Sequence, residues 1–335
     1  MDTPSKANRF FFFVLLHSLL VAEVFALINF RLLLPNDIYL PLWAILFIGQ
    51  FFTFFVPCAI VAVKYRGKLG ELFPMRAMGA ANWLMIIGMM LAIQPPIMML
   101  ALATSQIFGN PIGDIVAEIN IQGNLLLTIG VVAVVPSVFE EIALRGVIFA
   151  GYRKTKLFTA AMINGLLFGI IHFSLQQFAY AFILGVIFCY FVYYTKSLIS
   201  AILAHFVLNG TQASLSFWAV GAESAMQEAM EYYGYAPYFE FSEALGLVIF
   251  GILAIICLGL FVLIFIKFKR YNYSRNLNAD IVSAIVIDPA DSGEYIDIQT
   301  LEIPGTPKVA TGFLWGSIGA YIAIMALLQI AMRIL

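Results

Sequence analysis

Charge is scarce in this chain. Lys, Arg, Asp and Glu together make up 11% of the 335 residues, whereas soluble domains carry roughly a quarter. The formal net charge of −1 gives no sign of a nucleic-acid partner. Cysteine is also rare, and Cys58, Cys189 and Cys257 each stand alone inside an apolar run. They are interpreted as packing residues, so neither disulfides nor a cysteine metal site are expected.

Apolar residues, in contrast, account for 62% of the sequence, and the mean hydropathy is +0.96. A soluble fold of this length could not bury so much apolar surface, but a bilayer accommodates it as spanning helices of about 20 residues each. The expected fold class is therefore all-α, a polytopic membrane helix bundle of about eight to nine transmembrane helices. The candidate spans are residues 10–30, 38–63, 80–104, 122–151, 157–175, 177–195, 197–218, 244–266 and 311–332.

The distribution of Lys and Arg predicts how these helices are oriented. With the N-terminus in the cytoplasm, fifteen of the eighteen basic residues fall in inner segments, and the outer side keeps only Arg31 and Arg333. The first apolar run lacks a small-residue cleavage site and is interpreted as a retained helix. We expect an integral membrane protein of a bacterial plasma membrane, with the bilayer as its surroundings.

The pattern divides the chain into four parts. They are N-terminal helices in 1–119, a catalytic membrane core in 120–218, an acidic, aromatic outer loop in 219–243 and C-terminal helices in 244–335. Within the last part, 268–310 is expected to form a small non-helical segment on the inner face. Its residues 281–287 and 295–303 alternate in the manner of a β-hairpin. No chemistry is evident in this segment. The outer loop is interpreted as a solvated loop whose tyrosines lie at the membrane interface, with a lid or substrate-docking element as the alternative.

Ionisable side chains inside an apolar helix are costly, and most of those in this chain cluster in the expected core. In the fourth span, Glu141 and Arg145 are four residues apart, so they share a helix face and can form an ion pair. Glu140 points about 140° away from Arg145 on the same helical geometry and lacks that partner. We interpret Glu140 as the chemical group, suited to a general base, and Glu141 with Arg145 as its supporting pair.

Two later spans add histidines. Phe168 and His172 share one face of the fifth span, and His205 and Asn209 share one face of the seventh. Counted at about 1.5 Å per residue from the inner helix ends, Glu140, His172 and His205 fall at comparable depth. The groups can therefore meet inside the membrane, in a cavity that must admit water.

These three motifs, Glu-Glu-x-x-x-Arg, Phe-x-x-x-His and His-x-x-x-Asn in that order on separate membrane helices, resemble the CPBP family of intramembrane proteases. This family, also called Abi or CAAX protease and bacteriocin-processing, includes the type II CAAX prenyl endopeptidases. The motifs are carried here by Glu140 to Arg145, Phe168 to His172 and His205 to Asn209. The resemblance covers roughly residues 120–215.

The resemblance implies a hydrolase that cleaves a peptide bond of a membrane-associated substrate. Glu140, helped by His172, would activate water, and His205 with Asn209 would stabilise the oxyanion. The family is named a metalloprotease family, so Glu140, His172 and His205 are also the ligands expected if a zinc ion is used. A metal-free glutamate mechanism fits the same residues, and the cofactor stays open between none and zinc.

Two other functions fit parts of the pattern. The first is a catalytically silent membrane scaffold or bacteriocin-immunity protein of the same family. The second is a proton-coupled transporter, since intramembrane Glu and His also build proton relays; the sequence lacks the internal repeats typical of transporters. The identity of the substrate and the oligomeric state are not readable from the sequence.

Overall fold

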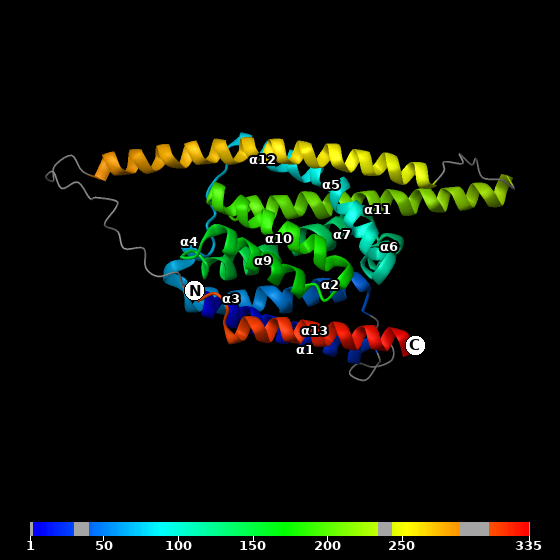
Figure 1. The fold of residues 1–335 in the computed structure, drawn as a ribbon. Helices are drawn as coiled ribbons and strands as arrows, with labels where there is room; N and C mark the ends of the chain where they lie inside the picture. The colour runs from blue at the N-terminus through cyan, green and yellow to red at the C-terminus, as the bar shows by residue number, and fades with distance from the viewer. Residues whose placement is uncertain (1–2, 30–39, 234–242, 288–307, 335) are drawn as a thin grey trace.

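The computed structural model describes residues 3–29, 40–233, 243–287 and 308–334, and this part of the chain is almost entirely helical. Most of its helices lie along one common direction (Figure 1). The expected all-α class is confirmed. The α-helices are α1 (Pro4–Asn29), α2 (Leu42–Gln50), α3 (Val56–Lys64), α4 (Leu69–Leu72), α5 (Ala80–Phe108), α6 (Pro111–Gln122), α7 (Leu125–Thr128), α8 (Val135–Glu141), α9 (Leu157–Ile171), α10 (Leu175–Thr195), α11 (Ile199–Tyr233), α12 (Glu243–Ile287) and α13 (Gly312–Ile334).

Several of these helices are connected by short 3-10 or π-helical segments and so form longer helical runs. A 3-10 turn, η2 (Arg66–Lys68), lies between α3 and α4. Three segments are π-helical: η1 (Phe51–Phe55), η3 (Ile129–Val134) and η4 (Ile142–Ile148). Each π-helical segment continues the α-helix before it, so α2 to α3 and α7 to η4 form two long rods.

The bundle has the surface of an integral membrane protein. Ile255 is 73% exposed and Leu263 is 67% exposed on α12, positions that favour lipid over water. Two apolar helical stretches have only 10–17 residues: Leu157–Ile171, which is α9, and Gly312–Leu328, which is part of α13. The described residues include six helices long and apolar enough to cross a membrane: Pro4–Phe25, Leu42–Lys64, Ala80–Phe108, Leu125–Ile148, Leu175–Thr195 and Ala244–Asn276.

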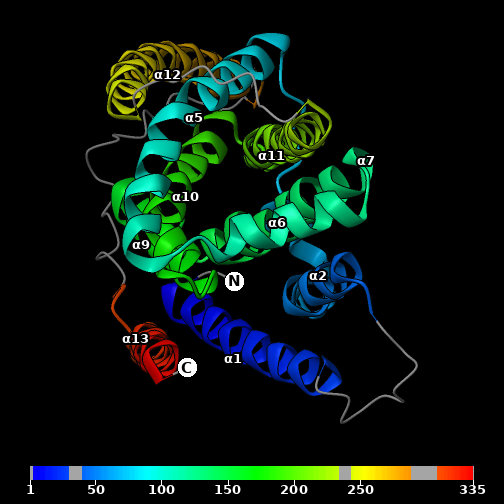
Figure 2. The same cartoon turned by 90° about the vertical axis from the view of Figure 1, so that its right-hand side faces the viewer.

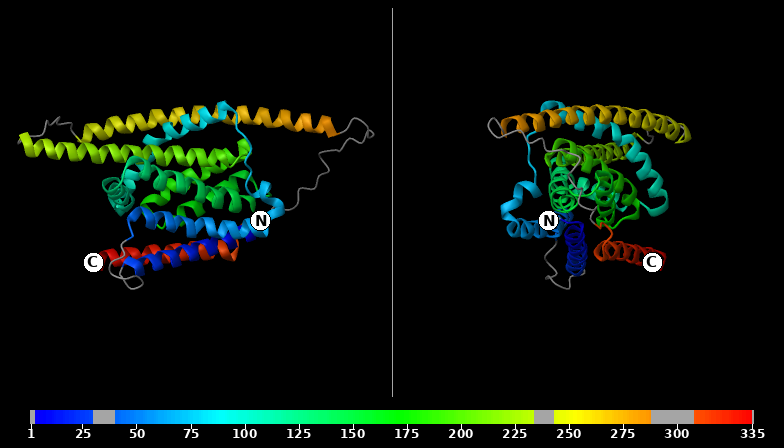
Figure 3. Two further views of the ribbon diagram at one scale, coloured as in Figure 1. Left: turned by 180° about the vertical axis from the view of Figure 1, so that it is seen from behind. Right: turned by 60° about the vertical axis from the view of Figure 1, so that its left-hand side comes forward.

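The central helices α9, α10 and α11 lie between two outer pairs. α5 packs against α12 on one side, and α1 packs against α13 on the other. The view from behind keeps this order (Figure 3), and α6 lies across the end of the bundle (Figure 2). α11, which holds the expected seventh span, packs against α5, α6, α8 and α10. Its polar side chains can therefore face protein instead of lipid.

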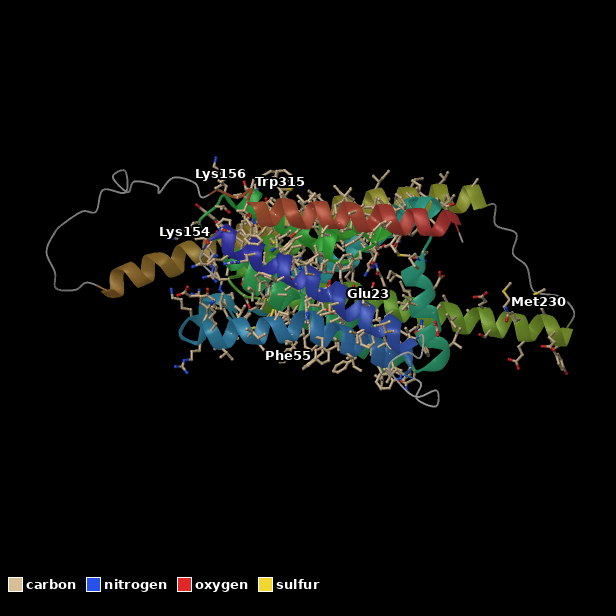
Figure 4. The ribbon with its side chains drawn as sticks, turned by 90° about the horizontal axis from the view of Figure 1, so that it is seen from below. Glu23, Phe55, Lys154, Lys156, Met230 and Trp315 are labelled. Carbon is tan, nitrogen blue, oxygen red and sulfur yellow. The ribbon has the colours of Figure 1, made fainter. Side chains whose placement is uncertain are left out.

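One end of the bundle gathers basic segments that are distant in sequence. The hydroxyl of Ser197 donates to the backbone oxygen of Arg76 at 2.6 Å. Lys154 and Lys156 lie at one end of the bundle, and Met230 lies beyond the opposite end (Figure 4). This grouping agrees with the charge distribution, whereas the side of the membrane that this end faces stays a prediction.

Two expectations about the connecting segments are wrong. α11 continues to Tyr233, so residues 219–233 of the expected outer loop are helical. α12 continues to Ile287, so residues 281–287 form a helix and not a strand. Residues 234–242 and 288–307 lie outside the described residues. A short apolar run is compatible with the 3.6-residue period of a helix and with the two-residue period of a strand. Extending an existing helix costs less free energy than nucleating a new secondary-structure element. In addition, α6 is a helix in a segment for which the sequence led to no prediction.

Glycines bring α9 and α10 into direct backbone contact. A Cβ atom on Gly165 would lie 2.7 Å from the backbone oxygen of Phe182, and one on Gly185 would lie 2.7 Å from the Cα atom of Gly165. Gly165 and Gly169 are four residues apart, the spacing that lets membrane helices approach closely. The two helices therefore behave as one packed unit behind the residues described below.

Replacing Gly185 with Val should lower the free energy of unfolding by about 1–3 kcal/mol, because the added carbons overlap the backbone of α9. The matched control is Gly259→Val on α12, where nothing lies within 4 Å of an added Cβ atom. Equilibrium unfolding in mixed detergent micelles measures both variants. Equal midpoints for the two would contradict the close crossing.

Candidate active site

The first motif lies at the junction of α8 and η4, inside the bundle. Glu140 is 5% exposed, Glu141 is fully buried and Arg145 is 1% exposed. Charged groups are rarely buried to this extent unless they are paired. Their partners therefore show how the site is built.

Glu141 is the centre of the charged cluster. Its Oε1 atom accepts from Arg145 Nη1 at 2.8 Å, which is the ion pair expected from the sequence. The same Oε1 atom accepts from His205 Nδ1 at 2.9 Å, a contact that no spacing rule reveals. Glu141 thus joins the first motif to the third across the bundle.

Arg145 is enclosed by aromatic rings and backbone. Its Nη2 atom donates to the backbone oxygen of Gly185 at 3.2 Å. The guanidinium carbon lies 4.3 Å from the ring centroid of Phe168 and 5.2 Å from that of Phe188. Ring faces carry partial negative charge and stabilise a desolvated cation. Phe168 therefore forms a wall of the Arg145 pocket, and its supporting role in a reaction stays a prediction.

His172 caps the C-terminal end of α9. Its Nδ1 atom donates to the backbone oxygen of Phe168 at 2.6 Å, one of the carbonyls left unpaired at a helix end. The proton on Nδ1 leaves a lone pair on Nε2. The next residue, Phe173, has a φ of 48° in the left-handed region, which ends the helix directly after His172.

The ring of Phe168 contacts both histidines and the charged Arg145 side chain. The ring centroid of Phe168 lies 4.8 Å from that of His172 and 5.8 Å from that of His205. The same centroid lies 4.3 Å from the guanidinium carbon of Arg145 in the first motif. The structure thus brings the three motifs into one cluster, although they lie on three different helices.

Asn209 uses its amide group on two neighbours. Its Nδ2 atom donates to the backbone oxygen of Val132 at 3.1 Å and to His205 Nε2 at 3.2 Å. Because Nδ1 of His205 donates to the Glu141 carboxylate, His205 is neutral in this arrangement and carries its proton on Nδ1. The expected pair of His205 and Asn209 on one face of α11 is present.

Gln50 contacts the site and was missed by the sequence reading. It is the last residue of α2, and its Nε2 atom donates to Glu140 Oε1 at 2.8 Å. The other carboxylate oxygen of Glu140 is buried and receives no hydrogen bond from protein groups. The only available signal was one uncharged polar residue in the second span, which does not distinguish a site residue from a packing residue.

Each π-helical segment borders the cluster. η1 begins directly after Gln50, η3 contains Val132, and η4 contains Arg145. π-helical turns are rare and occur often at functional sites, because they shift the side chains that follow to another face. The π-helical turns in the two rods therefore help to place the side chains of the site.

A metal site is not assembled from the side chains described here. Among the residues that the structure describes, no three His, Cys, Asp or Glu side chains lie together in a way that could hold a metal ion. One nitrogen of His205 faces Glu141 and the other faces Asn209, so neither is directed at an open position. The cofactor prediction, either none or zinc, is left to be tested by experiment.

The fold and the cluster define a class: a polytopic membrane protein with a buried Glu, Arg, His and Asn site at the centre of its bundle. Residues 122–211 match the model of a family described as type II CAAX prenyl endopeptidase Rce1-like. The resemblance to the CPBP family, drawn from the three motifs, is confirmed over this segment and points to a protease. Comparison with curated proteins and with solved structures gives no significant match.

Proposed function

We propose that this protein is an intramembrane endopeptidase that hydrolyses a peptide bond of a membrane-associated substrate with water activated by Glu140 and His172. The observation that carries this proposal is a buried carboxylate oxygen, Glu140 Oε2, with no protein donor. A carboxylate oxygen that no protein donor occupies is free to accept a proton from an attacking water.

In the proposed reaction, the water oxygen bonds to the carbonyl carbon of the scissile peptide, and one water proton passes to Glu140. The negative charge moves to the former carbonyl oxygen. Glu140 then gives the proton to the leaving nitrogen as the carbon–nitrogen bond breaks. His172, fixed through Nδ1, offers Nε2 to the water from the side of α9. Proton and charge balance without any further reactant.

His205 and Asn209 are proposed to stabilise the oxyanion. An amide N–H of Asn209 turns from His205 Nε2 to the developing oxyanion. His205 adds a second donor when both of its ring nitrogens are protonated. Glu141 lies 2.9 Å from His205 Nδ1 and holds the imidazole ring in place by accepting its N–H. The role of Glu141 thus extends beyond its pairing with Arg145.

The proposal is tested by comparing peptides released from membranes of the native host with the wild-type chain or Glu140→Ala. Peptides present only with the wild type define the cleaved bond, and a synthetic peptide spanning that bond is then incubated with purified protein in liposomes. Identical peptide sets would overturn the proposal. Incubation with and without a zinc chelator tests the metal requirement in the same assay.

Asn209→Leu should lower kcat for this synthetic peptide by about 10²- to 10³-fold, the usual loss for one oxyanion donor. Asn120→Leu is the matched control, because Asn120 bonds to Ser216 between α6 and α11 and has no contact with the cluster. A kcat for Asn209→Leu equal to that of the control would assign Asn209 to packing alone.

A further inference from the structure

Gln50 reaches the proposed base from a part of the chain that the family match does not cover. The match begins at residue 122, and Gln50 closes α2, far before it. Its amide Nε2 donates to Glu140 Oε1 at 2.8 Å. The N-terminal helices therefore supply a direct partner to a side chain of the matched segment.

The bond is directed at Glu140 alone. The Oε1 atom of Gln50 is buried and receives no hydrogen bond from a protein donor, so no other helix determines how this amide is oriented. Gln94 behaves differently, because its amide bonds both to the backbone oxygen of Leu208 and to Gln212, as expected for a residue that ties helices together. A glutamine that served only to join α2 to α8 would be expected to use both ends of its amide.

The bond also makes the two oxygens of Glu140 unequal. Oε1 is occupied by the Gln50 N–H, whereas Oε2 receives no protein donor. A hydrogen bond to one oxygen fixes the rotation of the carboxylate group and leaves the other oxygen as the basic atom. Small errors in the position of a catalytic group are costly, since a displacement of about 1 Å can lower a rate about a hundredfold.

We propose that Gln50 is a positioning residue for peptide-bond cleavage, which holds the Glu140 carboxylate so that Oε2 faces the attacking water. This inference rests on the function proposed above. Gln50 acts through Glu140 and takes no proton itself. The substrate should bind equally well without Gln50, and the loss should fall on the chemical step.

The test uses the purified full chain in liposomes and the synthetic peptide spanning the bond cleaved by the wild type. Gln50→Met keeps the side-chain volume and removes the donor; we expect kcat to fall about 10- to 100-fold with KM within about twofold. Gln50→His restores an N–H donor at similar reach and should recover most of that kcat. Asn82→Leu, which breaks the buried pair of Asn82 and Asn272 between α5 and α12, controls for lost helix packing.

Thermal unfolding of each variant in detergent gives the fraction of folded protein, so that kcat is compared per folded molecule. A wild-type kcat in Gln50→Met, or equal values in Gln50→Met and Gln50→His, would overturn the positioning role. Glu140→Gln separates the two hypotheses. If Glu140→Gln is fully active, the proposed protease site itself fails. If it is inactive while Gln50→Met is unaffected, only the role of Gln50 fails.

Discussion

Glu140→Gln should lower kcat for the synthetic peptide by about 10²- to 10⁴-fold, the usual contribution of a general base. The replacement amide has the same shape, and its oxygen can still accept from Gln50, which lies 2.8 Å from Oε1 in the wild type. What it loses is the capacity to take a proton from water. Initial rates in liposomes, normalised to folded protein, measure the effect.

The control for this variant is Glu228→Gln, which removes one carboxylate from an exposed position on α11 and should leave kcat unchanged. Binding of the synthetic peptide to Glu140→Gln should persist, because the change affects chemistry and not the fold. Retention of full activity would show that Glu140 is not the base and would favour the catalytically silent scaffold considered at the outset.

Arg145→Met should lower the free energy of unfolding by about 3–5 kcal/mol, because it leaves the buried Glu141 without its cation. The pair is fully buried, with 2.8 Å between Arg145 Nη1 and Glu141 Oε1. Unfolding in mixed micelles at equilibrium gives the value. The double variant, Arg145→Met with Glu141→Leu, should recover much of the loss, because no charge is then left unpaired.

An ion pair on the surface of the same protein provides the contrast. Arg153 lies 3.5 Å from Glu71, and their side chains are 42% and 63% exposed. Arg153→Met should cost no more than about 1 kcal/mol, because water and salt already screen this pair. Similar losses for Arg145→Met and Arg153→Met would contradict the view that burial makes the first pair essential.

The parts of the site that could be predicted are those fixed by spacing along one helix. Glu141 and Arg145, and likewise His205 and Asn209, are four residues apart, and each pair meets as helical geometry requires. The contact of Glu141 with His205 joins residues 64 positions apart, so it depends on how α11 packs against α8. A single sequence holds no information on that packing.

The helix boundaries could likewise be predicted where the local sequence determines them and not where tertiary packing does. Each expected span coincides with a helix or with a run of joined helices, because about 20 consecutive apolar residues permit little else in a bilayer. The extensions of α11 to Tyr233 and of α12 to Ile287 were not foreseen, since polar residues there fit a loop and a helix equally well. The π-helical segments carry no recognisable sequence signal.

The glycine contact between α9 and α10 has a consequence for how a substrate can be admitted. These helices provide Phe168 and His172 on one side and the Gly185 carbonyl that holds Arg145 on the other. Because a Cβ atom on Gly185 would lie 2.7 Å from the Cα atom of Gly165, the two helices form a closely packed wall of the site. A peptide substrate would therefore have to reach Glu140 without passing between α9 and α10. Because Gln50 on α2 donates to Glu140 at 2.8 Å, a displacement of α2 would also disturb the orientation of the Glu140 carboxylate.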